Sequence, residues 1–205
     1  MQSESGLLRW LNVPFVYNAF SAAVGANALR RRLIQNHVGA KPGDKVIDVG
    51  CGSALALQWL PDVQYIGLDI NPDCIAFARR TSGSKGTFVV GDARSVRADP
   101  RFNDADIVMA IGTLHHLDDE DAAQCIQFAY DVLKTGGRFV SHDACWVPAQ
   151  GALSRYIMSA DRGRNIRTEQ QYRQLAAKVF REVDTWVDTK PMRIPYVTVV
   201  VECEK

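Results

Sequence analysis

The chain lacks the features that mark several large classes of protein. Its 24 basic residues nearly balance 23 acidic ones, and the net charge of +1 argues against an electrostatic grip on nucleic acid or an anionic membrane. No unbroken apolar run approaches the roughly 18 residues that span a bilayer, and the opening MQSESGLLRWLNVPF has no secretory leader pattern. The five cysteines form no Cys-x-x-Cys pair, which indicates reduced thiols and no metal site. We therefore expect a cytoplasmic protein with neither a membrane span nor a nucleic-acid partner.

What the sequence does contain is an ordinary globular composition, with 47% hydrophobic and 23% charged residues. A length of 205 residues suits one domain with a full hydrophobic core. We divide this domain into N-terminal helices (1–43), a core of alternating strands and helices (44–145), a helical cap (146–178) and C-terminal strands (179–205).

Alternation of short apolar segments with amphipathic ones runs through the core. It predicts an α/β fold with a doubly wound, mostly parallel sheet. The last two apolar segments are joined by a loop too short for a crossover helix, so they should lie antiparallel to each other. We expect strands at 46–49, 65–68, 88–90, 106–111, 138–141, 183–187 and 197–201, and core helices at 53–60, 72–80 and 119–133.

A tight turn, Gly50-Cys51-Gly52, joins the first strand to the next helix. Such a turn lets a ligand approach the backbone and points N–H groups at it. The dinucleotide fingerprint is incomplete, because Leu55 stands where its third glycine would be. Asp48 would also repel a pyrophosphate. An amine or a sulfonium near the turn suits Asp48 better.

Two further aspartates end the next strands along the same edge of the sheet. Asp69 comes about twenty residues after the turn, where an acid can accept both hydroxyls of a ribose. Asp92 ends the third strand, where a carboxylate can receive an exocyclic amine such as that of adenine. Each aspartate alone could equally be a turn former. Three of them at successive strand ends favour a nucleoside-binding edge.

These motifs occur in the order VIDVGCGSA, GLDINPD, VVGDARSV, DIVMAIGTLHHLDDED and LKTGGRFV. As a set they resemble the class I S-adenosylmethionine-dependent methyltransferases, and more narrowly the small-molecule branch (types 11 and 12) that acts on quinones, sugars, lipids and natural products. The resemblance covers about residues 15–145 and the tail strands. The glycine pattern of this family is Gly-x-Gly-x-Gly, and here Ala54 takes its third glycine position. It implies a Rossmann-like fold with a seven-stranded sheet and an antiparallel terminal strand, and S-adenosylmethionine as cofactor.

The resemblance also implies roles for single residues. The glycine turn would lie along the methionyl part of the cofactor, and Asp69 would hold the ribose. Tyr17 matches an aromatic residue that closes over the cofactor in relatives, although Tyr17 could equally be a core aromatic. The cofactor-binding residues expected are Tyr17, Asp48, Gly50, Cys51, Gly52, Asp69, Ile70, Asp92, Ala93, Ile111 and Gly112.

Histidines near the carboxyl edge are candidate bases for an acceptor whose nucleophile carries a proton. His142, with Asp143 beside it, ends the fifth strand at this edge and is the first candidate, although it could merely cap that strand. His115 is the second, with His116 beside it, although LHHL occurs in this branch with many substrates. His37 belongs to an outer helix and is interpreted as structural.

The cap is rich in basic residues. Between residues 150 and 178 it carries six Arg or Lys, including Arg162 and Arg164, against Asp161 and Glu169. Such a lid could clamp a phosphate or carboxylate, or it could be a solvated helical surface. Its apolar side chains Trp146, Tyr156, Ile157 and Met158 could face a substrate or the core, and for all four we expect the core.

The sequence therefore predicts methyl transfer to a small molecule, with a hydroxyl or amine of an anionic metabolite, sugar or lipid intermediate as acceptor. Two alternatives stand beside it: an NAD-linked oxidoreductase on a similar sheet, and a catalytically silent cofactor-binding module. The sequence leaves the acceptor and the oligomeric state open.

Overall fold

The computed structural model describes residues 24–161 and 163–205. Tyr17, Arg162 and the helix predicted before residue 24 lie outside this part. The elements follow in the order α2 (Ala26–Leu33), the π-helical η2 (Ile34–Val38), β1 (Lys45–Val49), η3 (Leu55–Trp59), β2 (Gln64–Asp69), α3 (Pro72–Ser82), η4 (Gly83–Lys85), β3 (Thr87–Val90), η5 (Pro100–Phe102), β4 (Ala105–Ile111), η6 (Leu114–His116), α4 (Asp119–Val132), β5 (Leu133–Trp146), α5 (Ala152–Ser159), β6 (Arg167–Thr168), α6 (Glu169–Ala176), β7 (Val183–Asp188) and β8 (Thr198–Glu204).

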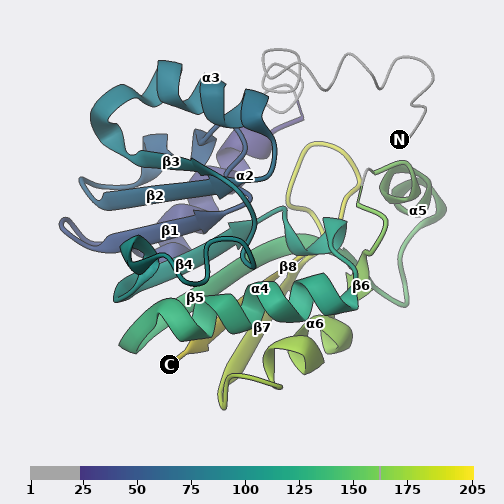
Figure 1. Cartoon of the computed structure of the whole chain (residues 1–205). Helices are drawn as coiled ribbons and strands as arrows, with labels where there is room; N and C mark the ends of the chain where they lie inside the picture. Colours follow the sequence, from purple (N-terminus) through teal and green to yellow (C-terminus); the bar gives the residue numbers. More distant parts are fainter. Residues whose placement is uncertain (1–23, 162) are drawn as a thin grey trace.

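One sheet organises the molecule, with strands in the order β3-β2-β1-β4-β5-β8-β7 (Figure 1). The first five strands of this order are parallel, and β8 is antiparallel to both β5 and β7. The two-residue β6 adds a parallel pairing to the end of β5. The predicted doubly wound sheet and its antiparallel final strand are confirmed, with β6 as an unpredicted eighth strand.

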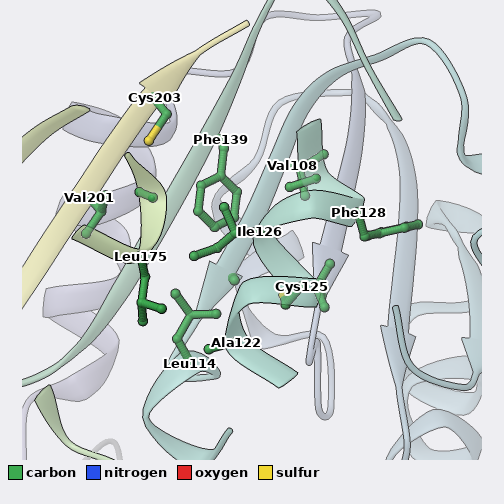
Figure 2. Packing of buried hydrophobic residues seen from close by; sticks show 14 of the residues in the cluster. Val108, Leu114, Ala122, Cys125, Ile126, Phe128, Phe139, Leu175, Val201 and Cys203 are labelled. Carbon is green, nitrogen blue, oxygen red and sulfur yellow. The ribbon is translucent and has the colours of Figure 1, made fainter. Parts of the chain in front are cut away.

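Helices cover both faces of the sheet (Figure 1). On one face, α2 and α3 bury Leu33 and Ile75 against β1, β2 and β4. On the other, α4 and α6 bury Ile126 and Leu175 against β4, β5 and β8, as Figure 2 shows. With both faces covered, the carboxyl edge of the parallel strands remains as the place where loops can form a site.

The starts of two helices follow sequence signals. The Asn71 side chain accepts hydrogen bonds from the N–H groups of Asp73 and Cys74, with Pro72 in the first turn of α3. Asp118 caps α4 by accepting from the N–H of Asp121. Both helices therefore begin where the sequence predicts.

The helix predicted over 53–60 is wrong in kind and length. The chain forms only the 3₁₀ turn η3 there, after Ala54 with a left-handed φ of 56°. Leu60 is extended, with ψ of 149°, because the ring of the following Pro61 disfavours a helical residue before it. The fifth strand is also longer than predicted, since β5 starts at Leu133, directly after α4.

The structure divides the predicted 146–178 cap in two. Its second half belongs to the sheet layer: β6 pairs with β5, and α6 buries Tyr172, Leu175 and Ala176 in the main core. Tyr172 also donates its hydroxyl to the Ala144 carbonyl at 3.0 Å. Of the described residues of this segment, 147–161 and 163–166 belong to neither the sheet nor α6, and Figure 1 shows α5 standing apart from the sheet. We call residues 147–161 and 163–166 the short cap.

Candidate active site

The glycine turn leaves open space at its second glycine. The N–H groups of Gly50 and Cys51 donate to the Leu68 carbonyl at 2.7 and 3.0 Å, which ties the turn to β2. Gly50 and Gly52 have φ of 74° and 53°, a left-handed conformation that favours glycine. A Cβ on Gly50 would meet Thr113 Oγ1 at 2.4 Å, whereas one on Gly52 would meet no described atom within 4 Å. A ligand can therefore approach the backbone at Gly52.

A second opening lies at the end of β4. Gly112 has φ of 70°, and among described atoms a Cβ there would meet only His115 Cε1, at 3.8 Å. The Gly112 N–H donates to the His142 carbonyl at 2.7 Å, and Ile111 before it is half-buried. The two open glycines thus stand at the carboxyl ends of the adjacent strands β1 and β4.

Asp69 is a turn former and an available acceptor at once. Its Oδ2 accepts from the Gly52 N–H and its Oδ1 from the Asn71 N–H, both at 2.8 Å. Each carboxylate oxygen has two lone pairs, so one on each remains for a ligand. Beside it, Ile70 leaves 72% of its surface exposed, an apolar side chain open to a flat partner.

Asp92 is held in its own loop. Its Oδ1 accepts from the Ser95 N–H at 2.8 Å, and this hydrogen bond is the main cause that lowers the pKa of Asp92. The carboxylate is thus ionised and fixed in direction beside the buried Ala93. It can accept from an amine donor.

Asp48 lies almost fully buried beneath the turn. Desolvation raises the pKa of its carboxyl to about 7, against a hydrogen bond from the Tyr65 hydroxyl at 2.7 Å and the charge of Arg30, which lower it. Cys51 beside it is no thiolate, since burial raises its thiol pKa far above the usual value. A nearby positive charge would therefore ionise Asp48 further.

His115 and Asp143 form a buried pair across two elements. Asp143 Oδ1 lies 2.8 Å from His115 Nδ1 and also accepts the His115 N–H at 3.1 Å, which fixes both the ring and the backbone of η6. Burial lowers the pKa of His115, but the hydrogen bond and charge of Asp143 and the charge of Asp161 outweigh it and raise the pKa. His115 is thus an oriented imidazole with Nε2 directed toward the short cap.

His142 has a different environment. It is neighbour to Asp143 in sequence, but successive strand residues point to opposite faces, so the two do not pair. Burial lowers the pKa of His142 to about 4, and its Nε2 has no hydrogen-bond partner among the described residues. This imidazole stays neutral in the hydrophobic face beside β8.

The short cap closes over His115. Asp161 Oδ1 lies 3.6 Å from His115 Nε2, and its Oδ2 accepts from the Tyr196 hydroxyl at 2.6 Å. The backbone of Gly163 packs closely against the imidazole, because a Cβ at this position would clash with His115 Cδ2. The Asn165 N–H donates to the His115 carbonyl at 3.0 Å. The histidine is therefore held from the sheet side by Asp143 and from the cap side by Asp161, Gly163 and Asn165.

Two of the cap's basic residues are structural. The guanidinium of Arg167 is buried and donates to the carbonyls of Leu114 and Leu117, both at 2.8 Å, and to Asp119. Arg173 bonds to β7 through the Val183 carbonyl and Thr185. Arg167 and Arg173 therefore fit neither the predicted anion-binding lid nor a solvated surface, because both fix the chain to neighbouring loops and strands.

Several residues that build the site could not be recognised in advance. Asp143 stands out in the sequence only as the neighbour of His142. The alternation of side chains along β5 is the signal that could have assigned the Asp143 side chain to the face opposite His142. Asp161 and Tyr196 lie 35 residues apart and meet only through the fold. Of the apolar cap residues, Met158 is core, as expected, while Tyr156 is 75% exposed.

Comparison with known proteins agrees with this geometry. A model of a methyltransferase domain matches residues 46–137. Phosphoethanolamine N-methyltransferase 1 of Arabidopsis thaliana is 28% identical over 180 residues, which cover 84% of this chain and 35% of the relative. Geranyl diphosphate 2-C-methyltransferase of Streptomyces lasalocidi is 25% identical, over 78% of this chain and 56% of the relative. The chain thus spans about a third to a half of the length of these relatives.

The fold also has close counterparts among solved structures. A SAM-dependent methyltransferase from Archaeoglobus fulgidus superposes with a TM-score of 0.73 at 17% identity, over 92% of this chain and 99% of that one. The match to a methyltransferase-domain model and the similarity to these relatives support a class I S-adenosylmethionine-dependent methyltransferase. No helix in the described residues is long and apolar enough to cross a membrane.

The residues present fit the cofactor of this class. Gly52 and Gly112 leave space at the backbone, Asp69 offers free lone pairs at the end of β2, and Asp92 holds an ionised carboxylate at the end of β3. Asp48, whose pKa burial raises to about 7, would gain from a cationic group beside the turn.

Proposed function

We propose that this protein transfers the methyl group of S-adenosylmethionine to a small anionic acceptor. When bound, the cofactor supplies an electrophilic methyl on a sulfonium, and the protein supplies alignment and a dry site. The observation that carries the proposal is the joint placement of two open glycines and the aspartates of β2 and β3 along one edge. Asp69 would hold the ribose and Asp92 the adenine amine, with Ile70, Ala93 and Ile111 as apolar lining.

For the acceptor, we assign His115 as the base that removes a proton from a hydroxyl or ammonium group. Its Nδ1 is bound to Asp143, so Nε2 is the nitrogen available for the transfer. His142, the first candidate from the sequence, is less suited, because burial lowers its pKa to about 4. The acceptor's negative charge is supported by the relatives, whose names specify phosphoethanolamine and geranyl diphosphate.

The test is calorimetric titration of S-adenosylhomocysteine into the wild type, Asp69→Ala and Asp73→Ala. Loss of two charge-assisted hydrogen bonds to a ribose should weaken binding by about a hundredfold or more in Asp69→Ala. Asp73 is the matched control, an exposed aspartate in the first turn of α3 just beyond the site. Equal affinity of all three proteins would contradict the assignment of the ribose site.

A further inference from the structure

A separate cavity lies in the short cap. It measures about 450 Å³, within the range of small-molecule sites, and is bounded by Trp146, Met158, Asp161, Gly163 and Arg164 among others. Met158 is fully buried and forms apolar floor, and Trp146 is half-buried. Neither the glycine turn nor the aspartates of β2 and β3 contribute to it. The cavity therefore lies beyond the nucleoside-binding edge.

The cavity shares two lining residues with the surroundings of the candidate base. Asp161 and Gly163 belong both to its wall and to the surroundings of His115: the first is 3.6 Å from Nε2, and the second packs on the ring. A molecule in this cavity would therefore lie next to the two residues that contact His115 Nε2 and the His115 ring. Because Gly163 has no side chain, the His115 ring can pack directly against this part of the cavity wall.

The lining carries one charge of each sign. Arg164 is exposed and makes no ion pair or hydrogen bond with another described residue, unlike Arg167 and Arg173, whose guanidinium groups are occupied by backbone carbonyls. Asp161 is fixed by the Tyr196 hydroxyl at 2.6 Å and the Gly163 N–H at 2.8 Å. An acidic group suits the free guanidinium, and a protonated amine suits the fixed carboxylate and the indole of Trp146.

We infer that this cavity is the acceptor subsite and that it takes a small zwitterion. The acidic group, a phosphate or a carboxylate, binds Arg164, and the amine lies between Asp161, Trp146 and His115 Nε2. This inference rests on the proposed function and specifies its acceptor.

The experiment uses four short probes of matched length with the full chain saturated with S-adenosylhomocysteine. 3-Aminopropylphosphonate and 4-aminobutyrate are zwitterions with a phosphonate and a carboxylate; propylphosphonate and propylamine each lack one charge. Titration should show both or one of the zwitterions binding more tightly than either singly charged probe. Arg164→Ala should weaken zwitterion binding by about tenfold or more. Arg155→Ala, an exposed arginine of the same cap outside the cavity lining, should leave it unchanged.

The zwitterion that prevails identifies the acid, phosphate or carboxylate. Equal weakening by Arg164→Ala and Arg155→Ala, equal affinity for propylphosphonate and the zwitterions, or binding of no probe would overturn the subsite. S-Adenosylhomocysteine affinity, measured first in each variant, separates the two proposals. If that affinity is intact while the probes fail, only the subsite is wrong. If S-adenosylhomocysteine itself does not bind, the proposed function fails, and titration of the probes alone then decides the subsite.

Discussion

At the scale of single residues, the same side-chain type acquires different chemistry from its surroundings. His115 and His142 are both buried, yet Asp143 and Asp161 raise the pKa of the first, while desolvation lowers that of the second to about 4. The difference arises from which face of β5 and which loop each ring meets. Of the two, only His115 combines an oriented Nδ1 with an Nε2 that faces a cavity-lining residue, Asp161.

The first residue-scale prediction concerns His115 as base. His115→Ala and the milder His115→Gln should lower turnover by about a hundredfold while S-adenosylhomocysteine affinity stays unchanged. Because the base must be neutral and the pKa of His115 is raised, wild-type turnover should fall as the pH drops through a value above 6.5. Stopped assays across pH 5–9 measure both effects.

His142→Ala is the comparison for that prediction. It should slow the reaction far less than His115→Ala, since its ring faces the hydrophobic side of the sheet. A larger loss in His142→Ala at unchanged cofactor affinity would return the assignment to His142. No loss in either variant would mean that alignment alone drives the transfer.

The second residue-scale prediction concerns Asp48. Its pKa in the fold, about 7, exceeds the unfolded value of 3.8, so between these values the folded state binds more protons and its stability falls as the pH rises. Asp48→Asn lacks this loss and can still accept from the Tyr65 hydroxyl. It should therefore be more stable than wild type at pH 8, by on the order of a few kcal/mol, with the gap closing toward pH 4.

Urea unfolding at several pH values measures this gap. The exposed Asp73→Asn serves as control and should show no such pH dependence. A gap that widens toward low pH would contradict the burial of an uncharged carboxyl at position 48. If the ammonium group of S-adenosylhomocysteine lies at the Asp48 carboxylate in the wild type, the Asp48→Asn variant should bind this ligand more weakly.

At the scale of elements, the segment after β5 contains two parts with different stability. α6 buries Tyr172, Leu175 and Ala176 and is tied to β7 by Arg173, so it is part of the core. α5 instead exposes Leu153 and Tyr156, at 61% and 75%, and buries mainly Met158. Elements with few buried contacts open at low free-energy cost.

Hydrogen exchange tests this division directly. Amides of residues 152–160 should exchange rapidly in the free protein and become protected when both S-adenosylhomocysteine and an acceptor are bound. Amides of residues 172–176 should exchange as slowly as those of the central strands, with or without ligand. Slow exchange throughout 152–160 in the free protein would mean that the short cap is as stable as the core and does not open.

At the scale of the whole molecule, the last strand of the chain is inserted between two earlier strands of the sheet. β8, late in sequence, lies between β5 and β7 and pairs with both along most of its length. The proposed cofactor edge at β1, β2 and β4 is thereby part of one continuous sheet with β5, beside which we propose the acceptor binds. Ligand binding at that edge should stabilise the entire fold.

The corresponding prediction is a thermal shift. At a concentration about 100 times its Kd, S-adenosylhomocysteine should stabilise the protein by roughly 2.7 kcal/mol, or a Tm rise of about 5–10 °C for a domain of this size. NAD at the same concentration is the control and should produce no rise, because Leu55 replaces the third glycine of a dinucleotide turn. A rise with NAD alone would contradict the cofactor assignment.

The sequence by itself determined that the core strands are parallel, where the glycine turn lies and which aspartates follow the strands. These features depend on local patterns: short apolar runs, an Asn-Pro start for α3, and acids placed directly after strands. The resemblance to methyltransferases followed from the same local motifs. Local signals failed at 53–60, where Pro61 and a left-handed Ala54 limit the helix to one 3₁₀ turn.

Only the tertiary structure decided the surroundings of the two histidines and of the cap arginines. Which histidine meets a carboxylate depends on strand alternation in β5 and on the position of η6, and Asp143 lies 28 residues from His115 in sequence. Whether an arginine is free or occupied depends on carbonyls from distant loops, as for Arg167, whose partner Leu114 is 53 residues away. Such long-range contacts leave no periodic pattern in the sequence, because their energy comes from burial and hydrogen bonding that exist only after the chain has folded.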